Sequence, residues 1–210
     1  MGWQRGTPAA GDEGSPRGAR LPSAVVADLV ARAKRGDGEA FGRLYDHYVG
    51  EVYAFVAVRL LDQEAAQDMT QSIFVRALQS LASCQEDAAF PGWLFAIARN
   101  SVTDHFRAAR YRPIALEETF ERTDPDLTPE ELAVQRDDAR VLREARERCL
   151  SASERELFDL ILTGLNDKQI GVALGRSHGA IRVAHHRLMI KLRDCLQRLN
   201  LFAEVRRASL

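Results

Sequence analysis

The chain has 210 residues, of which 46% are hydrophobic and 28% are charged, a size that suits one larger helical domain or two small ones. No stretch approaches the roughly 20 uninterrupted apolar residues of a membrane span, and residues 1–22 lack the apolar segment of a signal peptide. We therefore expect a cytoplasmic protein without membrane insertion. The cysteines, Cys84, Cys149 and Cys195, are odd in number and form no CxxC pair, which predicts no disulfide framework.

Charge is segregated along the chain, although the formal net charge is only −1. Residues 90–112 carry four arginines against one aspartate, and residues 176–198 carry six basic side chains against one aspartate. Between them, residues 117–131 hold seven carboxylates against one arginine. Lys34, Lys168 and Lys191 are the only lysines, so the positive charge is mostly guanidinium, which suits bidentate contacts with phosphate and guanine.

The first half of the chain predicts a tail followed by helices. Residues 1–22 are rich in Gly, Pro and charge, so we expect them to form a disordered tail. Helical periodicity begins near Ser23, and apolar residues recur at three- and four-residue spacing over residues 41–56, which marks one side of a long helix. Further helices are predicted over residues 63–81 and from Pro91 to near Arg110. No segment shows sustained period-two alternation, so the predicted fold class is all-α.

Prolines and the acidic run indicate a domain boundary at residues 113–129. Helical pattern then resumes over residues 130–150, and Ser153 with Glu156 has the S-x-x-E spacing of a capping box that opens the next helix. The predicted division is an N-terminal tail (1–22), a first helical domain (23–112), a flexible acidic linker (113–129), a second helical domain (130–200) and a C-terminal tail (201–210).

Two short helical segments joined by a tight turn follow Gly164. Asn166 and Gln169 fit the N-terminus of the first segment, Gly175 fits the left-handed residue after its end, and Ser177 can cap the second. This pattern predicts a helix-turn-helix, in which the second helix enters the major groove of DNA and presents its early residues to the bases.

Apolar spacing separates the two faces of the second segment. The core-facing positions are Ile181, His185, Leu188, Leu192 and Leu199, which leaves Arg182, His186 and Arg187 facing outward. The alternative is a surface helix with solvated charges, because a charge pattern alone is weak evidence of nucleic-acid binding. We interpret His185 as a half-buried histidine, and no metal site or cofactor is predicted.

Two other strings connect the chain with a known family. Residues 68–78 read DMTQSIFVRAL, and residues 90–107 read FPGWLFAIARNSVTDHFR. They resemble the second conserved region of extracytoplasmic-function (ECF) RNA polymerase sigma factors of the sigma-70 family, and the helix-turn-helix resembles their fourth region. The resemblance covers about residues 25–199, with both regions in the family's order. It implies two helical domains that bind core RNA polymerase and recognise and open the −10 and −35 elements of promoters.

The resemblance also implies roles for individual residues. The surface that docks on the clamp helices of the largest polymerase subunit, beta-prime, corresponds to Asp68, Gln71, Phe74 and Arg76. Phe74 fits the apolar core equally well, and Trp93 and Ile97 fit the core better than a wedge between bases. The −10 element corresponds to Asn100, Asp104, Arg107 and Arg110. An Asn amide can read a base edge, whereas Arg107 and Arg110 suit phosphates. The −35 element corresponds to Ser177, His178, Arg182, His186 and Arg187.

Further expectations follow from the same resemblance. The loop at residues 82–89 resembles the one that captures a base flipped from the non-template strand. The acidic linker is similar to the segment that threads through the polymerase cleft, although a solvated spacer has the same composition. The second domain is expected to contact the beta flap, and an anti-sigma protein is an expected partner that no feature of this chain demonstrates. Val183 and Ala184 depart from the family's polar residues, which leaves fewer contacts for the −35 element.

Two other classes of protein compete with this interpretation. A helix-turn-helix regulator that acts without core polymerase predicts a ligand or phosphoacceptor domain with strands, which the all-α first half opposes. An enzyme on a helical bundle needs a catalytic motif, and the sequence has no HExxH, Gly-rich phosphate loop or Cys/His cluster. We therefore predict a protein that is not an enzyme.

Overall fold

The structure, a computed structural model, describes residues 20–60, 62–109 and 142–208, with side chains as far as residue 108 in the second range and 199 in the third. Its elements are α1 (Ser23–Lys34), α2 (Gly38–Leu60), α3 (Gln63–Gln79), η1 (Leu81–Ser83), η2 (Asp87–Ala89), α4 (Phe90–Ala109), the helical segment 142–149, α6 (Ala152–Leu162), α7 (Asp167–Leu174) and α8 (His178–Ala208). The described ranges contain no strand, and the all-α prediction is confirmed. Most of the predicted N-terminal tail, the acidic linker, Arg110 and residues 130–141 lie outside them.

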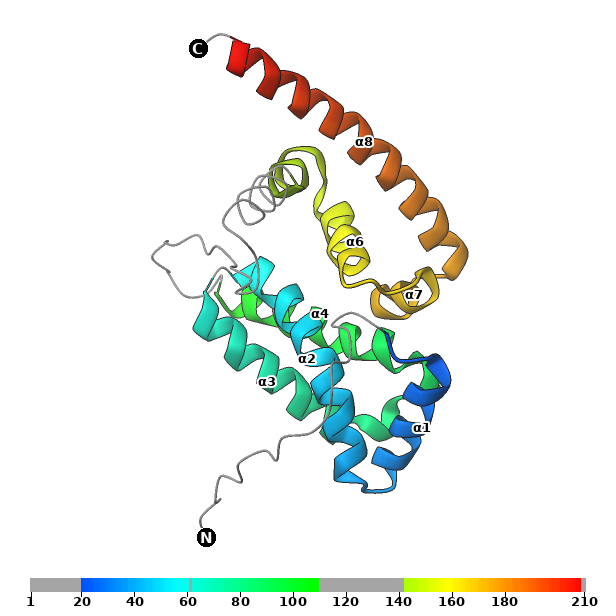
Figure 1. The fold of residues 1–210 in the computed structure, drawn as a ribbon. Helices are drawn as coiled ribbons and strands as arrows, with labels where there is room; N and C mark the ends of the chain where they lie inside the picture. The colour runs from blue at the N-terminus through cyan, green and yellow to red at the C-terminus, as the bar shows by residue number, and fades with distance from the viewer. Residues whose placement is uncertain (1–19, 61, 110–141, 209–210) are drawn as a thin grey trace, which may run out of the picture.

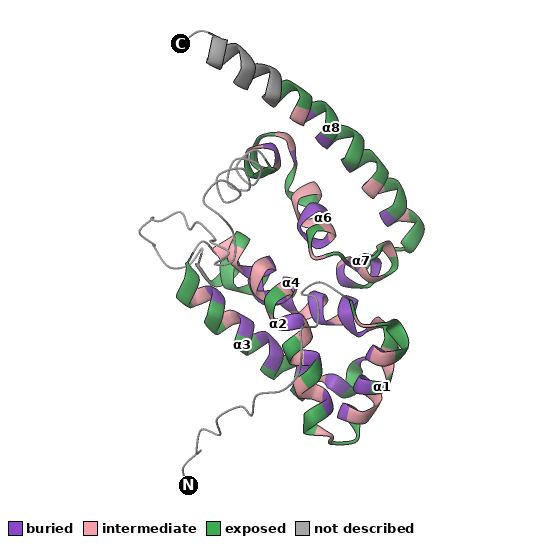
Figure 2. Cartoon of the chain, in the orientation of Figure 1, coloured by how far each residue is buried: buried purple, intermediate pink, exposed green. Residues whose placement is uncertain are grey.

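The four helices α1 to α4 form the N-terminal unit, which we define as residues 20–109 (Figure 1). Each presents its apolar face inward, as the purple segments of Figure 2 show. Phe55 of α2 meets Phe95 of α4 edge to face, with 5.4 Å between ring centroids, a favoured aromatic geometry. The Asp62 carboxylate caps α3 by accepting hydrogen bonds from the backbone N–H groups of Glu64 and Ala65.

The helical segment 142–149 with α6, α7 and α8 forms the C-terminal unit, residues 142–208 (Figure 1). Asn166 and Gln169 form the predicted capping box at α7, and Gly175 adopts the left-handed conformation at φ 63°. The capping box of α6 is formed by Ser151 and Glu154, so the prediction of Ser153 and Glu156 was wrong by two residues. Ser151 has the extended backbone that an N-cap requires, whereas Ser153 already lies inside the helix.

The two units pack against each other, and α7 lies along α4 in the most extensive of the contacts between their helices. A Cβ built on Gly92 of α4 would stand 2.4 Å from the backbone oxygen of Gln169 in α7, so this approach depends on glycine. Arg59 of α2 pairs with the buried Asp159 of α6 at 2.7 Å, and Arg99 of α4 pairs with Glu156 at 2.5 Å. The sequence predicted two helical domains joined by a flexible acidic linker. It gave no sign that the two domains contact each other.

A disulfide joins Cys149 to Cys195, with 6.4 Å between their Cα atoms. The prediction that the chain lacks a disulfide framework was therefore wrong for this pair. The prediction relied on the local spacing and the number of cysteines, whereas the fold brings together two positions that are 46 residues apart. Cys84 is a free, buried cysteine in the N-terminal unit.

None of the helices in the described part of the chain combines the length and the apolar character that crossing a bilayer requires.

Candidate nucleic-acid interface

The exposed stripe of α4 carries three of the predicted −10 residues. Asn100, Asp104 and Arg107 are all exposed, as their spacing of four and three residues along one helical face predicts. Arg107 is 75% exposed, and its guanidinium lies 3.7 Å from the Asp104 carboxylate. An ion pair this open to water is weak and easily exchanged, so a phosphate can replace Asp104 as the partner of Arg107. Trp93 and Ile97 pack partly buried against the core, as predicted.

A second exposed surface lies on α3. Asp68, Gln71 and Arg76 are exposed, and Arg76 also donates a hydrogen bond to Ser101 of α4 at 3.1 Å. Phe74 is only 3% exposed and packs its ring against Tyr45 with 4.8 Å between centroids. The sequence left open whether Phe74 contacts core polymerase or belongs to the apolar core, and the structure places it in the apolar core. In this arrangement it supports the surface formed by its neighbours and has almost no area of its own to offer a partner.

The loop at residues 82–89 is held from both sides. Lys34 of α1 bonds the backbone oxygen of Cys84 and the carboxylate of Asp87, each at 2.5 Å. Lys168 of α7 lies 3.5 Å from the exposed carboxylate of Glu86. Cys84 is buried, and its burial raises the pKa of the thiol. The loop is thus an ordered edge of the N-terminal unit and lies next to the helix-turn-helix.

The helix-turn-helix presents its predicted DNA-contacting residues to solvent. Five side chains at the start of α8 are exposed: Ser177, His178, Arg182, His186 and Arg187. Ile181 and Leu188 are buried on the opposite face, and the Ser177 hydroxyl accepts a hydrogen bond from the Ala180 N–H at 3.3 Å. These positions match the predicted division of faces. The N-terminus of a helix is a favourable place for a phosphate, and the first turn of α8 lies at this surface.

His185 and Val183 fill the remaining positions of this surface. The His185 Nδ1 atom lies 2.8 Å from a carboxylate oxygen of Asp167, and the ring is half-buried between α8 and α7. This contact agrees with the interpretation of His185 as a structural residue, and the described side chains contain no cluster suited to a metal ion. Val183 is 52% exposed and offers no hydrogen bond to a base edge.

Two acidic residues of α6 that pair with arginines of the N-terminal unit were not predicted from the sequence. Asp159 is 5% exposed and holds Arg146 through two hydrogen bonds of 2.8 Å, in addition to Arg59. Burial lowers the pKa of Arg59, and the charge of Asp159 opposes that shift. Asp159 interrupts the apolar run of α6, which is a sequence signal for a buried ion pair. Glu156 pairs with Arg99 but gives no comparable signal, because it lies in the charged stretch 154–156 at the start of α6.

The C-terminal unit exposes a basic helix-turn-helix and the N-terminal unit exposes a basic helix of its own, an arrangement that suits a DNA-binding protein. The family model described as Sigma-70 region 2 matches residues 44–112. The chain is 33% identical to the ECF RNA polymerase sigma factor BldN of Streptomyces coelicolor, over 79% of this chain and 63% of BldN. It is 34% identical to the ECF RNA polymerase sigma factor ShbA of Streptomyces griseus, over 80% of this chain and 94% of ShbA. The chain belongs to the family of ECF RNA polymerase sigma factors.

A solved structure shares the fold of this chain. The structure of CnrH in complex with the cytosolic domain of CnrY matches with a TM-score of 0.60 and 24% sequence identity. The match covers 83% of this chain and 98% of CnrH. This chain therefore shares the fold of CnrH. The chain spans slightly less than two thirds of the length of BldN, which is a longer protein.

Proposed function

We propose that this chain binds core RNA polymerase and directs it to promoters by recognising and opening −10 elements and recognising −35 elements. The observation that carries the proposal is the separation of two exposed surfaces on one helical unit. Asp68 and Gln71 lie on α3, whereas Asn100, Asp104 and Arg107 lie on α4. A protein that must hold polymerase and DNA together needs two such surfaces, and a regulator that binds DNA alone needs only one.

The roles of the two surfaces follow from their chemistry. On α3, Asp68, Gln71 and Arg76 offer polar contacts to the clamp helices of the polymerase, with Phe74 supporting them from the core. On α4, the Asn100 amide can donate to and accept from one base edge, and Arg107 can hold a phosphate. Arg110 belongs to the same proposal but lies outside the described residues. The loop at residues 82–89 is the proposed pocket for a flipped base.

The C-terminal unit is the proposed reader of the −35 element and the partner of the beta flap. Arg182, His186 and Arg187 share the exposed face of α8, and Ser177 and His178 stand at its N-terminal end. Val183 and Ala184 offer no side-chain hydrogen bonds. Recognition of the −35 bases therefore depends on the few polar side chains that remain on this face of α8. We therefore propose that the −10 contacts contribute more to promoter choice.

The packing of α7 on α4 supports a dependence on core polymerase. The names of the two promoter elements place them about 25 base pairs apart. Because ten base pairs of B-DNA span about 34 Å, this separation is roughly 85 Å along the DNA. In this structure α7 of the helix-turn-helix contacts α4, the helix proposed to read the −10 element. The Glu156 carboxylate also pairs with the Arg99 guanidinium of α4. One molecule in this arrangement cannot reach both elements, so binding to core polymerase must separate the two units.

Transcription with purified components tests the proposal. Core polymerase with this chain is expected to start RNA at a cognate promoter, whereas core alone or the chain alone is not. The free chain is expected to bind the same promoter only weakly at physiological salt. Tight, sequence-specific binding by the free chain, without association with core, would instead favour a helix-turn-helix regulator.

An inhibitory protein partner is a further part of this proposal. The solved CnrH structure contains the cytosolic domain of CnrY, and its fold is shared by this chain. A partner that acts as an anti-sigma factor is expected to compete with core polymerase for the chain. Competition measured with a purified candidate tests this expectation, and simultaneous binding of the candidate and core would contradict it.

A further inference from the structure

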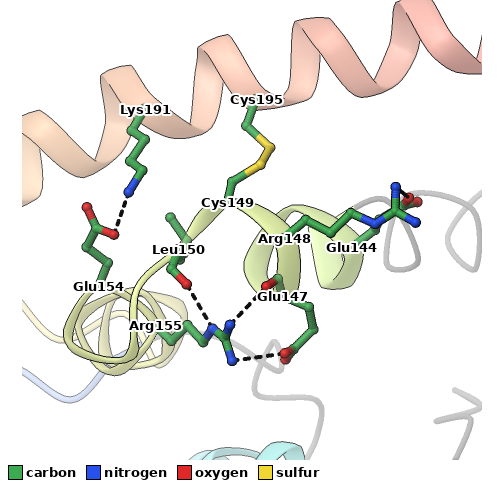
Figure 3. The surroundings of a disulfide bond; sticks show 9 residues. All are labelled: Glu144, Glu147, Arg148, Cys149, Leu150, Glu154, Arg155, Lys191 and Cys195. Atoms are coloured by element: carbon green, nitrogen blue, oxygen red, sulfur yellow. Dashed lines mark hydrogen bonds and ion pairs between the residues drawn. A yellow bond between two sulfur atoms is a disulfide. The ribbon is translucent and has the colours of Figure 1, made fainter.

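The disulfide of the C-terminal unit lies at the junction between α8 and the start of the unit. Cys149 ends the helical segment 142–149, and Cys195 belongs to the buried face of α8, with a Cα separation that a disulfide accommodates without backbone movement (Figure 3). Cys195 continues the apolar stripe of Ile181, Leu188 and Leu192, so it faces the core by helical spacing alone. Cys149 is half-buried and is the more accessible of the two.

A structural disulfide is unexpected in a protein that works with RNA polymerase, because thiols inside most cells are kept reduced. We propose that Cys149 and Cys195 form a reversible redox site whose oxidation fixes α8 against the rest of the C-terminal unit and strengthens reading of the −35 element. This inference rests on the proposed function, since polymerase binding is what places the pair among reduced thiols. Disulfides in that environment are mostly transient and redox-sensing.

The oxidant that we propose is a low-molecular-weight disulfide, and the reaction is thiol–disulfide exchange. The Cys149 thiolate attacks one sulfur of the oxidant, which releases one small thiol and leaves a mixed disulfide on Cys149. The Cys195 sulfur then displaces the second small thiol and forms the protein disulfide. The two cysteines lose two electrons, the oxidant gains them, and the two cysteine protons end on the released thiols. Excess small thiol reverses both steps.

Oxidation acts on the half of α8 that follows the recognition residues. The contact of α8 with α7 is much more extensive than its contact with α6. One turn before Cys195, Lys191 pairs with Glu154 at 2.7 Å, and both side chains are partly exposed (Figure 3). An ion pair of this kind is weak and is screened by salt. The disulfide adds a covalent tie that neither salt nor exchange of ion-pair partners can loosen.

The segment on the other side of the disulfide is itself firmly attached. Arg155 of α6 donates hydrogen bonds to the backbone oxygens of Glu147 and Leu150, at 2.9 and 3.0 Å (Figure 3). Arg146 also binds the buried Asp159 of α6. The segment 142–150 and α6 therefore form one block. Since α8 is continuous from the recognition residues to Cys195, tying Cys195 to this block fixes the orientation of the recognition helix before DNA binds, which lowers the entropic cost of binding.

The chemistry of the site can be measured without any promoter. In a Cys84→Ser chain, only the proposed pair contributes thiols. After incubation with oxidised glutathione, removal of excess reagent and denaturation, an alkylating reagent is expected to add nothing, and after reduction it is expected to add two groups per chain. Two alkylated cysteines after oxidation, or a glutathione adduct that persists on Cys149, would overturn the proposed pair.

The effect on the protein is measured on the same chain in its two redox states. The oxidised form is expected to melt about 10 °C higher than the reduced form, the shift expected for closing a loop of this kind in a small domain. Holoenzyme made with the oxidised chain is expected to bind a promoter that has a −35 element several-fold more tightly than holoenzyme made with the reduced chain. The difference should vanish on a promoter without a −35 element.

The control variant is Cys149→Ser, which changes the half-exposed member of the pair and avoids the buried one. Its holoenzyme is expected to bind like the reduced chain under both conditions. Equal promoter affinity in the two redox states of the Cys84→Ser chain would overturn the effect on −35 reading. Failure to bind core polymerase in every state would instead overturn the proposed function, because the proposed core-binding surface on α3 lies in the other unit.

Discussion

Asn100 is the residue at which reading of the −10 element can be separated from polymerase binding. It is exposed on α4, on the same stripe as Asp104 and Arg107, and its amide can bond a base edge. Replacing Asn100 with Ala is expected to weaken open-complex formation by about 1–3 kcal/mol for a lost base contact and to leave the affinity for core polymerase unchanged. Open complexes are measured by the reactivity of unpaired thymines, and core affinity by titration.

Asp68→Ala is the matched control, because Asp68 is an exposed residue of α3 rather than α4. It is expected to weaken core binding, and open-complex formation should recover when the variant is present at saturating concentration. If Asn100→Ala abolished core binding and left promoter opening intact at saturation, the assignment of the two surfaces would be reversed.

Arg182 and Arg187 are both exposed on α8, and we expect them to make different types of contact with DNA. With Val183 and Ala184 unable to bond a base, we expect Arg182 to read a base and Arg187 to hold a phosphate. Arg182→Ala should relax sequence specificity at one position of the −35 element. Arg187→Ala should weaken binding to all promoters alike and reduce the slope of log affinity against log salt concentration by about one. Transcription from a panel of single-base promoter variants measures both. A uniform loss with Arg182→Ala would show that it only positions the helix.

At the scale of elements, the polar tie between α6 and α8 has a defined pH dependence. The hydrogen bond from Lys191, and then those from Ser151, lower the pKa of Glu154 to about 2 from its ordinary 4.5. A carboxyl group with a lowered pKa in the folded state stabilises that state fully above its ordinary pKa, and the contribution is lost as the pH falls toward the folded value. Glu154 therefore stabilises the C-terminal unit above about pH 4.5 and ceases to do so near pH 2.

The corresponding experiment compares urea unfolding of the wild type and Glu154→Gln at several pH values. The wild type is expected to be the more stable at pH 6, and the difference should shrink between pH 4.5 and pH 2. Asp194→Asn, which changes an exposed carboxylate of α8, provides the comparison and should show a smaller effect. A difference that stayed constant over this range would exclude the ion pair as its source.

The elements differ in how far the sequence could predict them. α7 and the start of α8 were predictable because their signals are local: Asn166 and Gln169 cap one helix, and Gly175 supplies the left-handed residue that ends it. The capping box of α6 was misplaced because two S-x-x-E strings overlap at residues 151–156, and the choice between them depends on backbone conformation. Cys195 lay on a recognisable apolar stripe, but nothing in the sequence identifies Cys149 as its partner.

The same contrast applies to the candidate site. The exposure of Asn100, Asp104 and Arg107 follows from helical spacing, which the sequence contains. The burial of Phe74 was left open, because an aromatic residue at the edge of an apolar stripe can face either way until its neighbour Tyr45 is placed. The pairing of Arg99 with Glu156 was beyond the sequence, because it depends on how two separate units meet.

At the scale of the whole molecule, the contact between the units pairs basic side chains that lie outside the proposed DNA-binding residues. Glu156 binds Arg99, Asp159 binds Arg59, and Lys168 lies near Glu86 of the loop at residues 82–89. Carboxylates thus occupy guanidinium groups of the N-terminal unit that would otherwise attract phosphate. The weak binding of free chain to promoters that we expect therefore has two causes: the spacing of the units is too short for both elements, and basic side chains are already paired.

Gly92 allows this packing to be tested with one substitution. An added Cβ would lie 2.4 Å from the Gln169 backbone oxygen and 3.0 Å from the Val172 Cβ, so the close approach belongs to α7 of the other unit. Because a backbone oxygen cannot rotate away as a side chain can, Gly92→Ala is expected to separate α7 from α4. Alanine also favours the helix over glycine by about 1 kcal/mol, so α4 itself should remain folded.

The expected result for Gly92→Ala is a larger radius of gyration of the free chain in X-ray scattering and tighter binding of free chain to promoter DNA, with Arg99 released from Glu156. Core-dependent transcription should be retained, since core polymerase already separates the units. Gly50→Ala is the matched control, because Gly50 is an exposed helical glycine of α2 with no heavy atom close to the added Cβ. It should gain helix stability without expansion. If Gly92→Ala left the radius of gyration unchanged and lowered core-dependent transcription, the glycine would serve the N-terminal unit itself, and the closed arrangement would not be what restrains the free chain.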